Sequence, residues 1–106
     1  MVTVIIKYKG TGNNAKNFVN EMLSSGLVDT IRQEEGNLRY EYCYPLEDEE
    51  SVILIDSWVN QEALDIHHQL PLMKRISELR EKYDLHMKVY RFISDDAQSD
   101  ESFIRK

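Results

Sequence analysis

Apolar and polar side chains alternate at the start of the chain, and this period of two is typical of a β-strand. The apolar members of one face are Val2, Val4, Ile6 and Tyr8. Glycines at positions 10 and 12 end the alternation. The sequence therefore predicts a first strand over residues 2–9 and a loop after it.

A helical spacing of apolar residues comes next, and Asn14 is suited to be the N-cap of this helix. The apolar positions that share one helical face are Ala15, Phe18, Val19, Met22, Leu23, Leu27 and Ile31. One helix is predicted over residues 14–31, although Ser24-Ser25-Gly26 interrupts the pattern. Whether it is continuous, kinked or broken at Gly26 stays open.

Two strands joined as a hairpin are predicted in the middle of the chain. Gly36 suits the left-handed position after a helix, and alternation then begins, so we expect Leu38 and Tyr40 to face the core. An acidic turn over residues 45–51 separates this strand from the apolar run Val52–Ile55. A run that is apolar on both faces is typical of an interior strand.

A second helical crossover and a last strand complete the pattern. Asn60 is placed to cap a short helix that ends at His68, and Pro71 can open another helix. The apolar stripe of the latter is Leu72, Ile76, Leu79 and Tyr83. Alternation over residues 85–90 predicts a fourth strand, whereas residues 94–106 are polar and largely aperiodic.

The order β-α-β-β-α-β predicts an α+β, ferredoxin-like domain over residues 1–93, with an acidic C-terminal tail over residues 94–106 that is mobile or docks on a partner subunit. In this fold both helical segments lie on one face of a four-stranded antiparallel sheet. The opposite face would carry Ile5, Ile53, Ile55, Tyr90 and Phe92. Such a patch favours a two-fold homodimer packed sheet to sheet, with Phe103 and Ile104 reaching across.

Composition narrows the function classes. The chain has 106 residues and a formal charge of -6, which disfavours nucleic acids and anionic membrane surfaces as partners. No stretch is long enough to span a bilayer. The single cysteine, Cys43, cannot form an intrachain disulfide and suits a reducing, cytoplasmic location.

The segment from Asp56 through Trp58 to His67 is the candidate site. Asp56 and Trp58 share one strand face, and His67 lies two to three turns into the next helix, so the three side chains can line one small-molecule cavity. His67 can act as a base near neutral pH, Trp58 supplies an aromatic wall, and Asp56 can orient the imidazole. No metal site is expected, because the adjacent His67 and His68 diverge by about 100° on a helix.

Two stretches within residues 34–68 resemble the antibiotic biosynthesis monooxygenase family of dimeric α+β barrel proteins. The stretch Glu35-Gly36-Asn37-Leu38-Arg39-Tyr40 is similar to the family's Glu-Pro-Gly-Cys-Leu-x-Tyr signature, with Glu35 at the proline position and Asn37 at the cysteine position. The stretch Asp56-Ser57-Trp58, followed by a helix that reaches His67, is similar to the family's acidic-x-Trp segment, with Asp56 in place of glutamate.

The resemblance implies a cofactor-free monooxygenase that oxidises a quinol-like or polyphenolic compound with molecular oxygen. It implies His67 as the catalytic base, Trp58 and Asn60 as positioning groups, and Tyr40 and Tyr42 as further polar contacts to the substrate. A related haem-degrading branch is disfavoured, because the first strand lacks that branch's asparagine and its tryptophan position holds His67.

Two other functions stay open. Relatives of the same superfamily include isomerases of small metabolites, although the sequence offers only scattered basic residues, such as Arg39 and Arg91, for a phosphorylated substrate. The third alternative is a small-molecule-binding or stress-related dimer without turnover. In that case Trp58 and His67 are core residues that hold a helix against a sheet.

Overall fold

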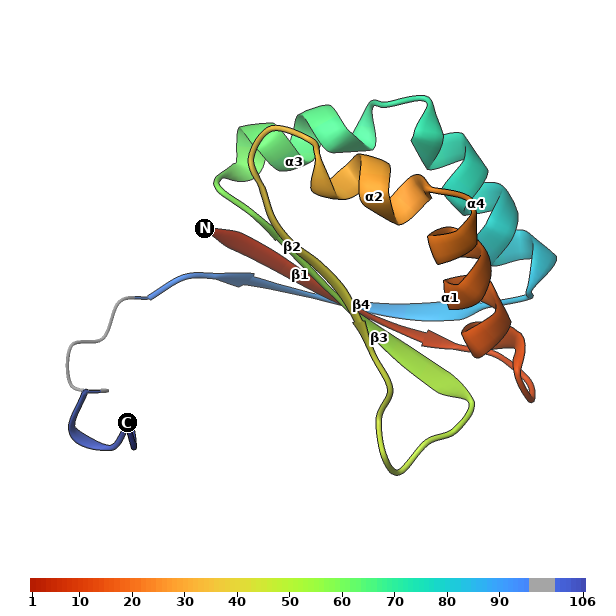
Figure 1. Cartoon of the computed structure of the whole chain (residues 1–106), viewed down its shortest axis with the longest axis horizontal. Helices are drawn as coiled ribbons and strands as arrows, with labels where there is room; N and C mark the ends of the chain where they lie inside the picture. Colours follow the sequence, from red (N-terminus) through yellow and green to blue (C-terminus); the bar gives the residue numbers. More distant parts are fainter. Residues whose placement is uncertain (96–100) are drawn as a thin grey trace.

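The computed structural model describes residues 1–95 and 101–106. Its elements are β1 (Val2–Lys9), α1 (Asn14–Ser24), α2 (Leu27–Arg32), β2 (Asn37–Cys43), β3 (Ser51–Trp58), α3 (Gln61–His68), α4 (Leu72–Lys82) and β4 (His86–Ile93). The four strands form one antiparallel sheet in the order β2-β3-β1-β4. The predicted ferredoxin-like fold is confirmed (Figure 1).

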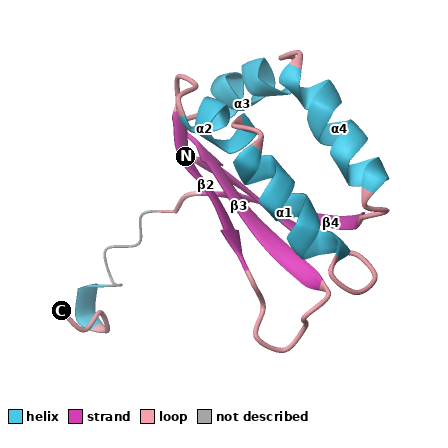
Figure 2. Ribbon diagram, turned by 45° about the vertical axis from the view of Figure 1, so that its right-hand side comes forward, coloured by secondary structure: helices cyan, strands magenta, loops and turns pink. Residues whose placement is uncertain are grey.

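The four helices lie on one face of this sheet (Figure 2). In the central strand β1, the side chains of Val2, Ile6 and Tyr8 are buried under the helices, as the alternation predicted. From the helix layer, Phe18, Met22 and Val28 are completely buried. The core therefore lies between the helices and one sheet face, and it includes the C-terminal half of β3, where the candidate residues stand.

The first helical segment is broken at Gly26. Gly26 has a φ of 82°, which a glycine adopts at no steric cost, and α2 begins directly after it. The expected N-cap is wrong by one residue: the cap position is Asn13, whose side chain makes no capping hydrogen bond, and Asn14 is already helical. By contrast, Asn60 caps α3 as predicted, because its Oδ1 accepts from the Ala63 N–H at 2.9 Å.

Gly36 fixes the path from α2 into β2. Its φ is 86°, and a Cβ built on it would lie 2.7 Å from the Ala63 Cβ, so the loop approaches α3 more closely than a side chain would allow. The Val59 N–H also donates to the Gly36 carbonyl at 2.9 Å. The start of β2 is irregular between Asn37 and Arg39, and Leu38 is 54% exposed instead of facing the core.

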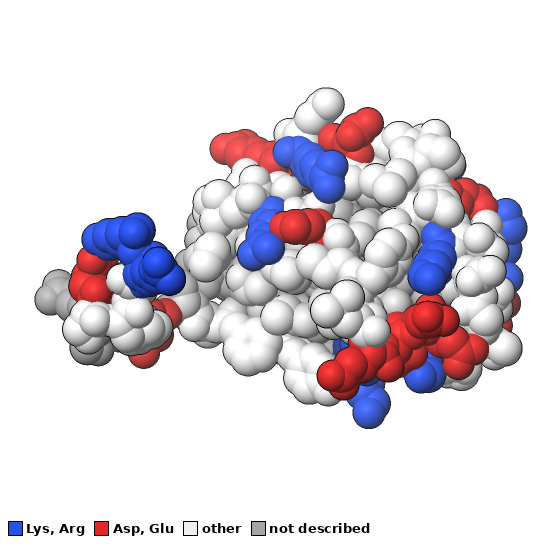
Figure 3. All heavy atoms as spheres, turned by 60° about the horizontal axis from the view of Figure 1, so that its bottom comes forward, with Lys and Arg blue, Asp and Glu red and all other residues white. Residues whose placement is uncertain are grey.

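The face of the sheet opposite to the helices carries the predicted apolar set. Ile5 pairs with Ile55 on one side and with Tyr90 on the other, so these side chains share that face. Viewed from this side, uncharged side chains cover much of the surface and acidic ones gather at one end (Figure 3). Every residue of β4 is exposed in the single chain, on both faces of the strand.

The predicted tail lies partly outside the described residues, because residues 96–100 are not among them. Phe103 and Ile104 are both exposed. Their contact with a second subunit, like the homodimer itself, stays a prediction.

Candidate functional site

The end of β3 and the last turn of α3 bring Trp58 and His67 into contact. Their rings stack with centroids 4.7 Å apart and an interplanar angle of 30°. Trp58 is completely buried and His67 is 3% exposed. The Asn60 cap helps to set this geometry, because it starts α3 at a defined residue and so fixes which face carries His67.

Glu34 contacts the other edge of the imidazole. Its two carboxylate oxygens lie 3.0 and 2.8 Å from His67 Nδ1. Glu34 stands just after α2, and the pair is largely shielded from solvent, with 13% of the Glu34 side chain and 3% of the His67 side chain exposed. Sequence reasoning missed Glu34. One signal was available: with Glu35 at the proline position of the family's Glu-Pro-Gly signature, Glu34 stands at the glutamate position.

Asp56 makes a different contact from the one expected. The Trp58 Nε1–H donates to Asp56 Oδ1 at 2.7 Å, so Asp56 holds the indole, whereas the carboxylate bonded to the imidazole is Glu34. Burial raises the pKa of Asp56 to about 6, and the hydrogen bond from Trp58 and the nearby His67 only partly oppose that shift. Asp56 therefore exchanges its proton closer to neutral pH than an exposed aspartate does.

Tyr40 and Tyr42 extend the polar cluster along the helix-facing side of β2. Their hydroxyl oxygens are 3.5 Å apart and their rings meet edge to face at 5.7 Å. Tyr40 is paired with Asp56 across the strands. Burial raises the pKa of both phenols, so both are neutral at physiological pH and can donate hydrogen bonds. Further along, Arg80 Nε donates to the Tyr8 hydroxyl at 3.1 Å.

Among the side chains of Asp56, Trp58 and His67, two polar atoms have no hydrogen-bond partner within the described residues: His67 Nε2 and the second oxygen of Asp56. Among the described residues, every side-chain nitrogen or oxygen that is sealed from solvent has a hydrogen-bond partner. Both atoms therefore keep a small opening to solvent. Asp56, Trp58 and His67 nevertheless line neither the pocket around Asn60 nor the hollow along β2, so the single cavity expected around the three side chains is not found at either place.

Asn60 lies at a surface pocket next to the buried cluster. The pocket has a volume of about 450 Å³ and is lined by Glu34, Glu35, Gly36, Val59, Asn60, Glu62, Ala63, Ile66 and Leu70. Glu34 belongs to both places, because it lines the pocket and also binds His67. The structure thus brings Asp56, Trp58 and His67 together, and it sets Asn60 in the pocket that Glu34 lines.

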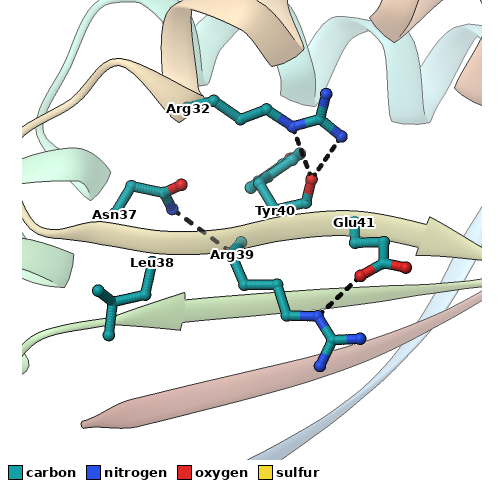
Figure 4. A pocket seen from close by; sticks show the side chains of 6 residues that line it. All are labelled: Arg32, Asn37, Leu38, Arg39, Tyr40 and Glu41. Atoms are coloured by element: carbon teal, nitrogen blue, oxygen red, sulfur yellow. Dashed lines mark hydrogen bonds and ion pairs between the residues drawn. The ribbon is translucent and has the colours of Figure 1, made fainter.

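A second hollow runs along the edge strand β2 (Figure 4). Its volume is about 390 Å³, and it is lined by Arg32, Asn37, Leu38, Arg39, Tyr40 and Glu41. Arg32 donates from Nε and Nη2 to the Tyr40 carbonyl at 3.0 and 2.8 Å, and Arg39 pairs with Glu41 at 2.8 Å. The two bonds from Arg32 satisfy one carbonyl of an open sheet edge, which discourages another strand from pairing there.

A scan against protein-family models matches residues 1–79 to the family described as antibiotic biosynthesis monooxygenase. The match covers β1 through most of α4, and therefore both segments that supply the Glu34, Trp58 and His67 side chains. The chain belongs to the antibiotic biosynthesis monooxygenase family.

Solved structures of antibiotic biosynthesis monooxygenases share its fold. A Deinococcus radiodurans protein named after this family matches with a TM-score of 0.80 and 18% identity, over 92% of this chain and 95% of that one. SnoaB, a cofactor-independent oxygenase from Streptomyces nogalater, matches with a TM-score of 0.74 and 13% identity, over 92% and 95% of the two chains. At these identities the similarity establishes the fold alone. No curated protein sequence matches the chain.

A conserved protein from Methanosarcina mazei is a third structural match, with a TM-score of 0.76 and 22% identity over 89% of this chain and 92% of that one. In residues 1–95 and 101–106, no three His, Cys, Asp or Glu side chains are grouped so that they could hold a metal ion. None of the helices that the structure describes has the length and apolar character needed to cross a membrane.

Proposed function

We propose that this protein is a cofactor-independent monooxygenase that oxidises a small quinol-like or polyphenolic compound with molecular oxygen. The observation that carries the proposal is the His67 imidazole, which stacks on Trp58 and is hydrogen-bonded to a carboxylate through Nδ1, and whose Nε2 has no partner among the described residues. A histidine held in this way is suited to remove a proton from a phenol or from an activated carbon. Membership of the monooxygenase family supports the same reaction class.

The reaction needs no redox cofactor if the substrate itself supplies the electrons. With an anthrone, His67 takes a proton from the activated CH2 group, and the resulting carbanion reacts with oxygen. The carbon passes from CH2 to C=O, which releases four electrons, and O2 is reduced to the new carbonyl oxygen and one water molecule. The protein's part in this scheme is to bind the ring system and to accept and return the proton.

The remaining candidate residues have supporting roles in the proposal. Trp58 provides a flat apolar wall for an aromatic substrate, and Asp56 fixes that indole through its N–H. Of the neutral hydroxyls of Tyr40 and Tyr42, which are bonded to each other, the one that accepts can donate its own hydrogen to a substrate oxygen. Asn60 acts at the pocket that Glu34 lines, where its side-chain N–H groups are available while its oxygen caps α3.

Oxygen uptake tests this function. A panel of hydroquinones and anthrones is incubated aerobically with the protein, and we expect protein-dependent uptake with at least one of them. The His67→Ala variant should lose about 10²- to 10⁴-fold in kcat, the range typical of a general base, and Trp58→Phe should show a smaller loss. The matched control is His86→Ala, because His86 is an exposed histidine on β4. Uptake that is absent across the panel, or unchanged in His67→Ala, contradicts the proposal.

A second candidate function is small-molecule binding without turnover. The observation that favours it is the near-complete burial of Trp58 and His67, which is also what packing between α3 and β3 requires. In that case a hydroquinone or anthrone would perturb the His67 ring resonances under anaerobic conditions, but it would be recovered unchanged in air. Recovery of more oxidised product in air than forms without the protein excludes this alternative.

The proposed assembly is a homodimer formed through the sheet face opposite to the helices. Tyr90 and Phe92 are half exposed on that face of an edge strand, beside Ile5 and Ile55 of the inner strands. Removing contiguous apolar side chains of this kind from water favours association.

A further inference from the structure

We infer that Glu34 is the positioning residue of the site, and that it holds neutral His67 in the tautomer with the proton on Nδ1. The basic atom of the site is then Nε2. The tautomer is a property of the folded chain and does not depend on the proposed function. Its use in proton abstraction does rest on that function.

The assignment of the proton follows from the chemistry of the two partners. Both Glu34 oxygens lie within hydrogen-bond distance of the same ring nitrogen, at 2.8 and 3.0 Å. An ionised carboxylate can only accept hydrogen bonds, so Nδ1 must carry the hydrogen. In a neutral imidazole the other nitrogen, Nε2, then keeps its lone pair.

The local fold holds Glu34 in place. The Glu34 N–H donates to the Ile31 carbonyl at 3.0 Å, and the Glu34 carbonyl accepts from the Asn37 N–H at 3.1 Å, so its backbone is bonded on both sides. Gly36 then packs against Ala63 of α3, and its carbonyl accepts from Val59. The loop that carries Glu34 is therefore attached to the same β3–α3 connection that leads to His67.

The other groups near His67 do not compete for Nδ1. Asp56 is bonded to the Trp58 indole, and Trp58 itself covers a face of the imidazole, not an edge. The His68 ring lies beside the His67 ring, with centroids 5.6 Å apart, but among the described residues no hydrogen bond joins the two rings. Glu34 is thus the one described side chain that is hydrogen-bonded to the ring.

A carboxylate bonded to the histidine Nδ1–H has a known effect on the catalytic rate of serine proteases. There the carboxylate that accepts from the histidine Nδ1–H sets the tautomer, and its replacement by an amide lowers kcat by about 10⁴-fold although the geometry is preserved. An amide in place of Glu34 is expected to act in the same direction, because its NH2 group can donate to Nδ1 and so stabilise the wrong tautomer.

The test is ¹⁵N nuclear magnetic resonance of the imidazole nitrogens in protein labelled at histidine. Protonated and unprotonated ring nitrogens resonate far apart, so the spectrum reports the tautomer directly. His68→Gln and His86→Gln assign the three histidines. We expect neutral His67 in the wild-type protein to carry its proton on Nδ1, a mixture of tautomers or the reverse one in Glu34→Gln, and at least partial recovery in Glu34→Asp.

Glu35→Gln is the matched control, because Glu35 lines the same pocket and carries the same charge but has no hydrogen bond to His67. Its tautomer should equal that of the wild-type protein. A wild-type His67 with the proton on Nε2, one that stays doubly protonated up to about pH 9, or a Glu34→Gln spectrum identical to the wild type would overturn the inference. If the tautomer shifts as expected but no substrate is oxidised, the proposed function fails and the positioning role of Glu34 stands.

Discussion

Asp56 and Glu34 show how two carboxylates near one imidazole come to differ in chemistry. Asp56 lies under the helices, where its single hydrogen bond comes from a neutral indole, and burial raises its pKa to about 6. Glu34 reaches the surface pocket and bonds the imidazole. The difference arises from where each residue stands: Asp56 lies inside a buried strand, whereas Glu34 lies in the loop that follows a short helix.

The raised pKa of Asp56 predicts a pH-dependent stability. The folded chain holds this proton more tightly than the unfolded chain, whose carboxyl has a pKa near 3.8, so the stabilising contribution is complete below about pH 4 and is lost as the pH rises through 6. Asp56→Asn cannot ionise and keeps an oxygen for the indole. At pH 8 its free energy of unfolding should exceed that of the wild type by about 2 to 3 kcal/mol.

Urea unfolding at pH 4 and pH 8 measures this difference. We expect the two proteins to approach each other at pH 4. Asp65→Asn, which changes an exposed aspartate of α3, should show a small effect that is equal at both pH values. If the gain from Asp56→Asn is also equal at both pH values, ionisation of Asp56 is not its cause.

At the scale of residues, the sequence was a better guide to which side chains are in contact than to their hydrogen-bond partners. Trp58 and His67 were expected in one site because strand alternation and helical periodicity place both on inward faces, and they are in contact. The partner of the imidazole could not be predicted, because Glu34 is 33 positions away from His67 and its contact depends on how two loops pack. Periodicity carries no information on such distances.

At the scale of elements, the two glycines that follow helices have different requirements. Both adopt a positive φ, but a Cβ on Gly36 would meet Ala63 at 2.7 Å and Val59 at 3.0 Å, whereas a Cβ on Gly26 would meet nothing within 4 Å. Gly36→Ala should therefore lower the free energy of unfolding by about 2 to 4 kcal/mol, from backbone strain and overpacking together.

Gly26→Ala is the matched variant, since it adds the same methyl group at a similar φ without the contact. We expect it to cost about 1 kcal/mol, the backbone term alone. Urea unfolding monitored by circular dichroism gives both values. Equal losses in the two variants would mean that the close approach of the Gly36 loop to α3 has no energetic weight.

The elements themselves followed from the period of the apolar residues, and the exceptions have local causes. The pattern could not decide between a kink and a break at Gly26, because an apolar stripe continues on both sides of a left-handed residue. Leu38 was expected in the core, but the irregular pairing at the start of β2 removes it from the alternation. The last strand also extends to Ile93, past the region where alternation was recognised.

At the scale of the whole molecule, β4 allows a direct test of the homodimer. Val89 and Tyr90 are neighbours with similar exposure, 56% and 50%, but Val89 shares the helix-facing side with Ile6 and Tyr90 shares the opposite side with Ile5. A dimer packed sheet to sheet buries only the second side. Tyr90→Lys should therefore raise the dimer dissociation constant by at least about 10-fold, because it places a charge in an apolar interface.

Val89→Lys adds the same charge to the same edge strand and should leave the dimer intact. Sedimentation or light scattering across the micromolar range measures the dissociation constants. A wild-type protein that is monomeric at these concentrations, or a dimer that responds to Val89→Lys and not to Tyr90→Lys, contradicts this interface.

Because Trp58 stacks on His67, the intrinsic fluorescence of the protein reports on the site. Trp58 is the sole tryptophan in the sequence, so all indole fluorescence of the protein comes from this one ring. Its emission depends on a single imidazole at 4.7 Å and on one carboxyl bonded to its nitrogen. A fluorescence titration of unlabelled protein, with light that excites indole and not the tyrosines, therefore follows the protonation of the site and the arrival of any aromatic molecule beside it, without a contribution from a second indole.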